Sequence, residues 1–212
     1  MKRLDECIRQ PVLPVLVIED AAKAVGLARA LQAGGLNAIE VTFRTKAAAE
    51  AIRRIREALP DLIVGAGTVI TPEQAAAALD SGVVFGLAPG LDPAIIAQFH
   101  ARGVPFMPGV MTPSEIQHGI RLGCLCQKFF PAETCGGVAQ LKAMAAPFKS
   151  FGVKFCPTGG IHLENMRNYL ALKEVFTVGG SWLATAEQIA GEKWGEITRQ
   201  VRLSLDSAAG GT

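Results

Sequence analysis

Short apolar runs recur along the chain, and each is followed by a turn and an amphipathic segment. The runs are apolar throughout rather than alternating with polar positions, which is typical of strands that are covered on both faces. The segments between them have helical spacing and readable helix starts. The eight predicted strands occupy residues 12–18, 38–42, 63–67, 83–88, 105–109, 124–130, 153–158 and 175–179.

Capping residues indicate where the predicted helices begin and end. We expect Asp20 to cap a helix over 21–32, which Gly34 and Gly35 would stop, and Thr45 to cap a helix over 46–59. Three more starts place a proline at the first helical position, behind the cap residues Thr71, Asp92 and Thr112. An amphipathic segment over 193–206 predicts a closing helix, and 208–212 a frayed tail.

Strands that alternate with helices are typical of parallel strands joined by crossover connections. Eight such units, with no G-x-G-x-x-G sequence after the first strand, favour a closed (β/α)₈ TIM barrel over an open doubly wound sheet. The length of 212 residues lies within the range of one such domain. We therefore expect a single α/β domain over 1–212, with a short N-terminal helix and a C-terminal closing helix.

Composition excludes several classes of protein. Half of the residues are hydrophobic and the net charge is +2, without a basic stripe, so we expect no nucleic-acid partner. The apolar stretch 12–18 is too short to span a membrane or to form a signal peptide. The five cysteines are odd in number and mostly in apolar surroundings, which favours reduced thiols in a cytoplasmic protein. No second Cys or His pair stands at zinc spacing, so we expect no metal.

One lysine, Lys128, interrupts the apolar run 124–130. Burying an ammonium is costly unless it is paired or loses its proton. Because burial favours the neutral amine, and a neutral amine forms a Schiff base with a carbonyl, Lys128 is the candidate nucleophile. The alternative is a lysine at a strand end whose head reaches water. A rival, Lys154, stands near the start of its strand and should face the opposite end of the barrel.

The other polar exceptions stand where predicted strands end, and this end carries the active site of a barrel. They are Glu40, Arg44, Thr68 and Thr158, and Pro89 directly follows the fourth predicted strand. Each alone has a structural interpretation, such as an ion pair between Glu40 and Arg44 or a polar strand end. Their convergence on one end favours a site that combines an amine with a general acid/base.

Glycine-rich turns follow the last two predicted strands, at Gly159-Gly160 and at Gly179-Gly180-Ser181. In barrels these two loops often bind phosphate through backbone N–H groups. Glycine lets the backbone approach an anion, and Ser181 adds a hydroxyl donor. These turns predict a phosphorylated substrate.

Five segments of the chain resemble, in order, the 2-keto-3-deoxy-6-phosphogluconate (KDPG) and 4-hydroxy-2-oxoglutarate (KHG) aldolases. The resemblance covers about 11–183 and is carried by EVTFRT at 40–45, GAGTV at 65–69, KFFPAE at 128–133, FCPTGG at 155–160 and GGSW at 179–182. It implies a metal-independent class I aldolase on a (β/α)₈ barrel, without a cofactor, usually as a homotrimer. Departures at Ala88 and over 133–137 lie near the mouth of the barrel and could alter specificity for the aldehyde half.

The resemblance also implies roles for the residues at the strand ends. Lys128 would form the Schiff base with the C2 keto group, and Glu40 would shuttle protons. The remaining members of the expected substrate site would hold the pyruvate carboxylate (Arg44, Thr68), line the substrate site (Pro89, Phe130, Thr158) and hold the phosphate (Gly159, Gly160, Gly180, Ser181). The open alternatives are an aldolase for the phosphogalactonate epimer, an aldolase mainly for unphosphorylated 4-hydroxy-2-oxoglutarate, a phosphate-binding barrel isomerase or epimerase, and a sugar-phosphate sensor.

Overall fold

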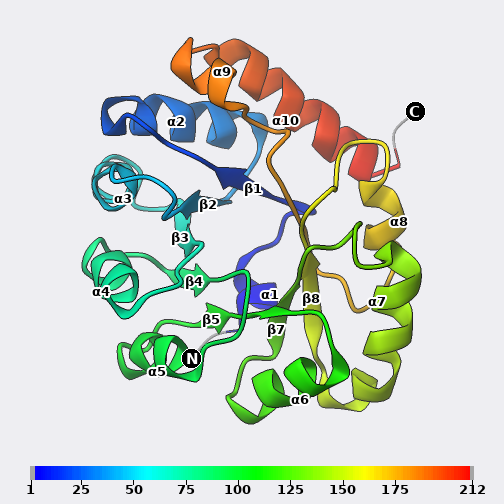
Figure 1. Ribbon diagram of the computed structural model, residues 1–212. Coiled ribbons are helices and arrows are strands. Elements are labelled where there is room, and N and C mark those ends of the chain that lie inside the picture. The colour runs from blue at the N-terminus through cyan, green and yellow to red at the C-terminus, as the bar shows by residue number, and fades with distance from the viewer. Residues whose placement is uncertain (1–2, 211–212) are drawn as a thin grey trace.

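The computed structural model describes residues 3–210, in which parallel strands form a curved sheet surrounded by helices (Figure 1). Every pair of neighbouring strands runs parallel, so the predicted α/β alternation is confirmed. One sheet has the order β5-β4-β3-β2-β1-β9, and the other has the order β6-β7-β8. Isolated parallel bridges join Phe155 to Val175 and Thr158 to Gly179, alongside β8 and β9. The carboxyl ends of all these strands therefore face the same side.

The strands lie close to the predicted ranges. They are β1 (Val12–Leu16), β2 (Ala38–Thr42), β3 (Ile63–Gly67), β4 (Phe85–Leu87), β5 (Phe106–Met107), β6 (Gly109–Val110), β7 (Cys126–Phe129), β8 (Lys154–Pro157) and β9 (Val178–Gly180). The predicted strand 105–109 is divided at Pro108, because proline has no N–H group to donate to a neighbouring strand. The part of the chain that the structure describes therefore contains nine strands where eight were expected.

The helices lie outside the strands, apart from one. They are α1 (Leu4–Cys7), α2 (Ala24–Gly34), α3 (Ala48–Ala58), α4 (Pro72–Asp80), α5 (Pro93–Ala101), α6 (Pro113–Arg121), α7 (Gly137–Ala145), α8 (Met166–Leu170), α9 (Ala186–Ala190) and α10 (Trp194–Ala208), with 3₁₀ turns at Ala21–Lys23 and Ala146–Phe151. The expected tail at 208–212 falls partly outside the described residues. None of the helices within 3–210 is long and apolar enough to cross a bilayer.

Most of the predicted helix starts are confirmed. The side chains of Thr71, Asp92 and Thr112 each accept a hydrogen bond from a first-turn N–H group, and Thr112 forms a capping box with Glu115. The prediction for Thr45 is wrong, because α3 begins only at Ala48. The Thr45 hydroxyl instead donates to the Ile18 carbonyl at 2.6 Å and ties the loop after β2 to the loop after β1.

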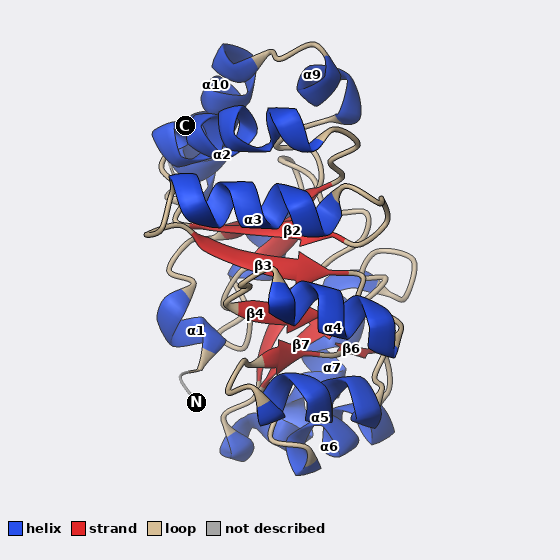
Figure 2. Ribbon diagram, turned by 90° about the vertical axis from the view of Figure 1, so that its left-hand side faces the viewer, coloured by secondary structure: helices blue, strands red, loops and turns tan. Residues whose placement is uncertain are grey.

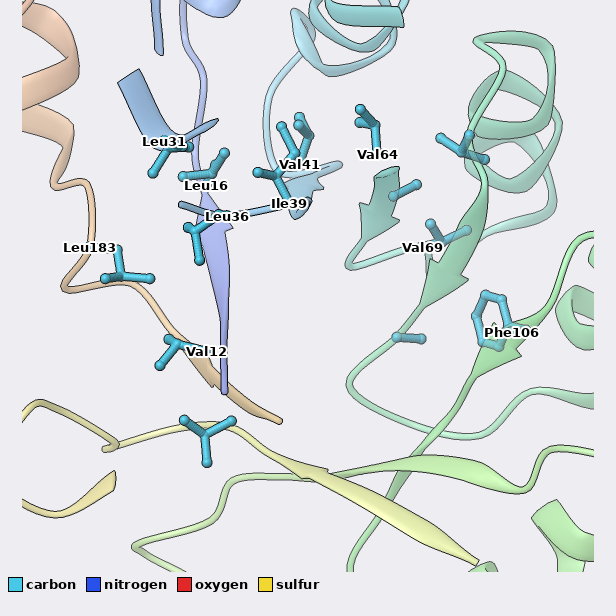
Figure 3. Close-up of a cluster of buried hydrophobic side chains, with 14 of the residues drawn as sticks. Val12, Leu16, Leu31, Leu36, Ile39, Val41, Val64, Val69, Phe106 and Leu183 are labelled. Carbon is cyan, nitrogen blue, oxygen red and sulfur yellow. The ribbon is translucent and has the colours of Figure 1, made fainter. Parts of the chain in front are cut away.

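Two hydrophobic clusters lie on opposite faces of the strands. The larger fills the space between strands and outer helices, and Val12 and Leu16 of β1 belong to it (Figure 3). The smaller takes the intervening Leu13, together with Phe85 and Met107. Leu4 and Ile8 complete it because α1 covers the amino ends of the strands (Figure 2). The inner face is thus apolar at one end, which leaves the carboxyl end for polar groups.

The closing helix α10 packs against α2, and a glycine makes the contact possible. A Cβ atom on Gly34 would lie 2.6 Å from Cβ of Val201 and 3.3 Å from the carbonyl oxygen of Thr198. Both are part of a packed helix interface and have little room to move. We expect Gly34→Ala to lower the free energy of unfolding by about 2 kcal/mol through overpacking, measured by urea denaturation.

The matched control is Gly195→Ala, the same substitution on the exposed surface of α10. The nearest atom to its added Cβ is Arg199 Nη1, at 3.7 Å. Because alanine favours a helix over glycine, this variant should be unchanged or more stable by up to about 1 kcal/mol. Equal stability of the two variants would contradict the tight packing of α2 on α10.

Candidate active site

The carboxyl ends of the strands bring together side chains that are distant in sequence. Lys128 on β7 is the register partner of Gly109 on β6 and of Cys156 on β8. Glu40 on β2 pairs in the same way with Val15 on β1 and with Gly65 on β3. Ala38 and Cys126 point to the inner face of the strands. Because every second side chain of a strand points to the same face, Glu40 and Lys128, two residues further on, also point inward.

Lys128 and Glu40 form a buried pair of opposite charges on this inner face. Lys128 Nζ lies 3.8 Å from Glu40 Oε1, and the two side chains are 4% and 1% exposed. This burial contradicts the alternative in which the lysine head reaches water. The other lysine considered, Lys154, lies at the start of β8, where its Nζ donates to the Lys173 carbonyl at 2.7 Å.

The carboxyl group of Glu40 has an unusual environment. Within residues 3–210, neither of its oxygens has a hydrogen-bond partner. Burial raises its pKa, and the positive charges of Lys128 and Arg44 oppose that effect only in part. A carboxyl group with a raised pKa can both give and take a proton, which is what general acid/base catalysis requires. Glu40 is therefore not the satisfied half of an ion pair with Arg44.

Two residues that the sequence analysis did not single out shape this pair. Gly67 leaves the space that Glu40 occupies, since a Cβ atom there would overlap its carboxylate. Cys156 is fully buried beside Lys128, and burial raises the pKa of its thiol to about 12, so it stays protonated. The period of two along β8, counted back from Thr158, could have placed Cys156 on the inner face.

Thr68 and Arg44 flank the buried pair on neighbouring loops. Thr68 directly follows β3 and is half-buried, with φ of +57°. A β-branched residue in this region is strained, and such strain gathers at functional sites. Arg44 follows β2 and is exposed, and its positive charge acts to lower the pKa of Glu40. The two residues offer a guanidinium and a hydroxyl beside the amine.

Phe130 and Pro89 lie on one side of Lys128. The centre of the Phe130 ring is 5.2 Å from Lys128 Nζ. Both residues line a pocket of about 280 Å³, together with Gly109, Val110 and Met111. This pocket adds an apolar wall close to the amine.

Thr158 and the glycine turns lie on the other side. Thr158 is buried, and its hydroxyl donates to the Cys156 carbonyl at 3.4 Å. Gly159 and Gly160 follow with φ of +100° and +76°, a conformation that favours glycine. Ser181 lines a separate pocket of about 240 Å³ with Val15 and Val17. A Cβ atom on Gly180 would overlap the Trp182 ring, so this glycine also serves the packing of the loop.

A further cavity, of about 220 Å³, lies at the amino ends of the strands and is lined by Leu4, His100 and Cys124. Throughout residues 3–210, no three His, Cys, Asp or Glu side chains are arranged to hold a metal ion. The polar groups with catalytic potential therefore gather at the carboxyl ends. The arrangement there can supply an amine, a proton shuttle and donors for two anionic groups.

Comparison with known proteins identifies a family. The model of the KDPG and KHG aldolase family matches residues 4–200. The KHG/KDPG aldolase of Escherichia coli K12 is 44% identical over 198 residues, which cover 93% of this chain and 92% of the relative. The 2-dehydro-3-deoxy-phosphogluconate aldolase of Dickeya dadantii is 46% identical over 202 residues, covering 95% and 92%.

Solved structures agree with the sequence comparisons. The KDPG aldolase of Legionella pneumophila, with pyruvate captured as a covalent carbinolamine intermediate, superposes with a TM-score of 0.89. It is 40% identical, over 93% of this chain and 95% of that one. Similarity of this extent covers the strands, the helices and the loops at the carboxyl ends alike. The chain belongs to the KDPG and KHG aldolase family.

Proposed function

We propose that this protein is a class I aldolase that cleaves 2-dehydro-3-deoxy-6-phosphogluconate to pyruvate and glyceraldehyde 3-phosphate. The observation that carries the proposal is the buried pair of Lys128 and Glu40, 3.8 Å apart, at the carboxyl ends of the strands. The covalent pyruvate carbinolamine of the Legionella relative supports amine chemistry. The name of the E. coli relative supports a second substrate, 4-hydroxy-2-oxoglutarate, cleaved to pyruvate and glyoxylate.

Lys128 begins the reaction in this proposal. The ammonium proton of Lys128 passes to Glu40, and the resulting amine adds to the C2 keto carbon. The carbinolamine takes that proton back as it loses water to give an iminium. The electron pair of the C3–C4 bond moves into the iminium to form an enamine, while the proton of the C4 hydroxyl leaves to Glu40. The aldehyde half departs. Protonation at C3 and addition of water then release pyruvate and restore the amine.

Glu40 is suited to carry these protons because burial raises its pKa and no hydrogen bond within 3–210 fixes its charge state. It receives the proton of the C4 hydroxyl and returns one to C3 of the enamine. Its distance of 3.8 Å from Lys128 Nζ supports this role, because the reacting carbons would be attached to that amine. The same carboxyl group can therefore serve in both directions.

The flanking residues bind the two anionic ends of the substrate. Arg44 and Thr68 hold the pyruvate carboxylate, which suits the planar fork of a guanidinium. Pro89, Phe130 and Thr158 enclose the keto-acid carbons. The phosphate is held by donors at the carboxyl end of β9 and in the loops that follow β8 and β9, namely Gly159, Gly160, Gly180 and Ser181. Positioning of this kind lowers the barrier by several kcal/mol.

The fold and assembly complete the proposal. The bridges beside β8 and β9, and the single residue Pro108 between β5 and β6, support one closed (β/α)₈ barrel over a single domain, 1–212. The family resemblance supports a homotrimer, which light scattering of the purified protein would test. The absence of disulfides among the five cysteines supports a cytoplasmic location.

The first test is trapping with pyruvate and borohydride. We expect the intact mass to rise by one reduced pyruvate, and the adduct to map to Lys128 in a peptide digest. Lys128→Met should keep the circular dichroism spectrum and lose activity by on the order of 10⁴-fold or more, because the nucleophile is gone. A folded native protein that forms no adduct would favour the isomerase or the sensor instead.

The position of Glu40 is tested by Gly67→Ala. The added methyl group overlaps the carboxylate and displaces it, so exchange of the pyruvate methyl protons with deuterium, followed by NMR, should slow by about 100-fold. Gly195→Ala, on the exposed surface of α10, is the matched control and should exchange at the native rate. A native rate of deuterium exchange in Gly67→Ala would contradict the role of Glu40 in the proton transfer.

The phosphate site is tested by Ser181→Ala. Loss of one hydrogen bond to a charged group should lower kcat/KM for the phosphorylated substrate by about tenfold. Deuterium exchange of pyruvate should stay at the native rate, because pyruvate has no phosphate. An unchanged kcat/KM would show that Ser181 does not bind phosphate. Parallel assays with the two C4 epimers distinguish the gluconate from the galactonate substrate.

A further inference from the structure

The turn that follows β8 is held by hydrogen bonds to its carbonyl groups. Ala132 N–H donates to the Thr158 carbonyl at 2.8 Å, and Glu133 N–H donates to the Gly159 carbonyl at 3.0 Å. The Asn165 side chain donates to the Gly160 carbonyl at 3.0 Å. The N–H group of Gly160, in contrast, has no acceptor among residues 3–210. The turn therefore presents a free donor, as an anion site requires.

The side chain of Glu133 lies against this turn. A Cβ atom on Gly160 would come within 2.7 Å of Cβ and 2.8 Å of Cγ of Glu133, so only a glycine fits beside this side chain. Glu133 is exposed, and its backbone is already tied to the turn. A carboxylate that swung onto the turn would accept the hydrogen bonds that a bound phosphate needs, and it would repel the phosphate.

Tyr169 holds this carboxylate. The tyrosine is fully buried on α8, and its hydroxyl donates to Glu133 Oε1. Burial and the neighbouring carboxylate both raise the pKa of Tyr169, so its hydroxyl stays protonated and remains a donor. The same hydroxyl lies 3.4 Å from the position of a Cβ atom on Gly137, at the start of α7. The acid is therefore bound to the helices behind the turn.

We propose that Tyr169 and Glu133 are a positioning pair that determines affinity for the phosphorylated end of the substrate. The backbone of Glu133 fixes the Gly159–Gly160 turn, and Tyr169 keeps the Glu133 carboxylate away from the donors of that turn. The inference rests on the proposed function, because it requires the turn to bind the phosphate. It assigns the pair no part in the chemistry at Lys128.

The test separates the two ends of the substrate. In Tyr169→Phe the carboxylate is released, so KM for 2-dehydro-3-deoxy-6-phosphogluconate should rise about tenfold, with kcat within about twofold of native. Deuterium exchange of the pyruvate methyl group should stay native, because pyruvate engages only the Lys128 end. A merely structural role for Tyr169 would slow the exchange and lower kcat as well, and that result would overturn the proposal.

The charge is tested by a second substitution. An amide has no negative charge, so the double variant Glu133→Gln/Tyr169→Phe should return KM to within about twofold of native. A KM as high as that of Tyr169→Phe alone would contradict the role of the carboxylate. An unchanged KM in Tyr169→Phe would contradict it too.

Two controls keep the outcome unambiguous. Glu133→Gln alone retains an acceptor for the Tyr169 hydroxyl and should bind the phosphorylated substrate with native KM, so its KM can overturn the proposal even if Tyr169→Phe does not fold. A tenfold rise in this variant would overturn the proposal. Borohydride trapping of pyruvate on the native protein reports on the proposed function separately. A native adduct together with an unaltered KM in Tyr169→Phe means that only the positioning pair has failed.

Discussion

The surrounding structure has to compensate for the burial of the charged pair Lys128 and Glu40. Each charge loses its water on the inner face of the strands, and burial of this kind costs several kcal/mol per ion. At 3.8 Å, without a hydrogen bond to either carboxylate oxygen within 3–210, the mutual attraction does not restore what hydration supplied. The surrounding apolar packing has to hold both groups in place. Burial therefore raises the pKa of the Glu40 carboxyl group, and a raised pKa is also the property that proton transfer needs.

The backbone at the end of β3, beside this pair, is also less stable than it could be. Gly67 has no side chain because the Glu40 carboxylate occupies that space, and a glycine in a strand weakens it. Thr68 follows at φ of +57°, a conformation that costs a β-branched residue about 1–3 kcal/mol. These two adjacent residues lie at the end of β3, directly beside the pair. The large hydrophobic cluster on the outer face offsets that cost at a distance from the site (Figure 3).

How far the sequence could predict this arrangement depends on the kind of signal. Hydrophobic periodicity and helix capping are local signals of the sequence. They could therefore predict the strands, the burial of Lys128 and the capped helix starts at Thr71, Asp92 and Thr112. The role of Gly67 was not, because it depends on a side chain from the neighbouring strand. Thr45 failed as a cap for the same reason, since its hydroxyl finds the carbonyl of Ile18 on another loop. The pair of Tyr169 and Glu133, 36 residues apart, also needed the fold.

In the proposed function the site divides along the substrate, and the two parts are built differently. The proposed keto-acid end relies on buried side chains from β2 and β7, because a bond-forming amine must stay within reach of its proton carrier. The proposed phosphate end relies on backbone donors in a glycine turn, which are weak singly and easily blocked by a neighbouring acceptor. A turn of this kind needs protection from the protein's own carboxylates as much as it needs attraction for the ligand. In the proposed arrangement the hydrogen bond from buried Tyr169 to exposed Glu133 provides that protection from outside the strands. Affinity for the phosphate can then vary without disturbing the proposed chemistry at Lys128.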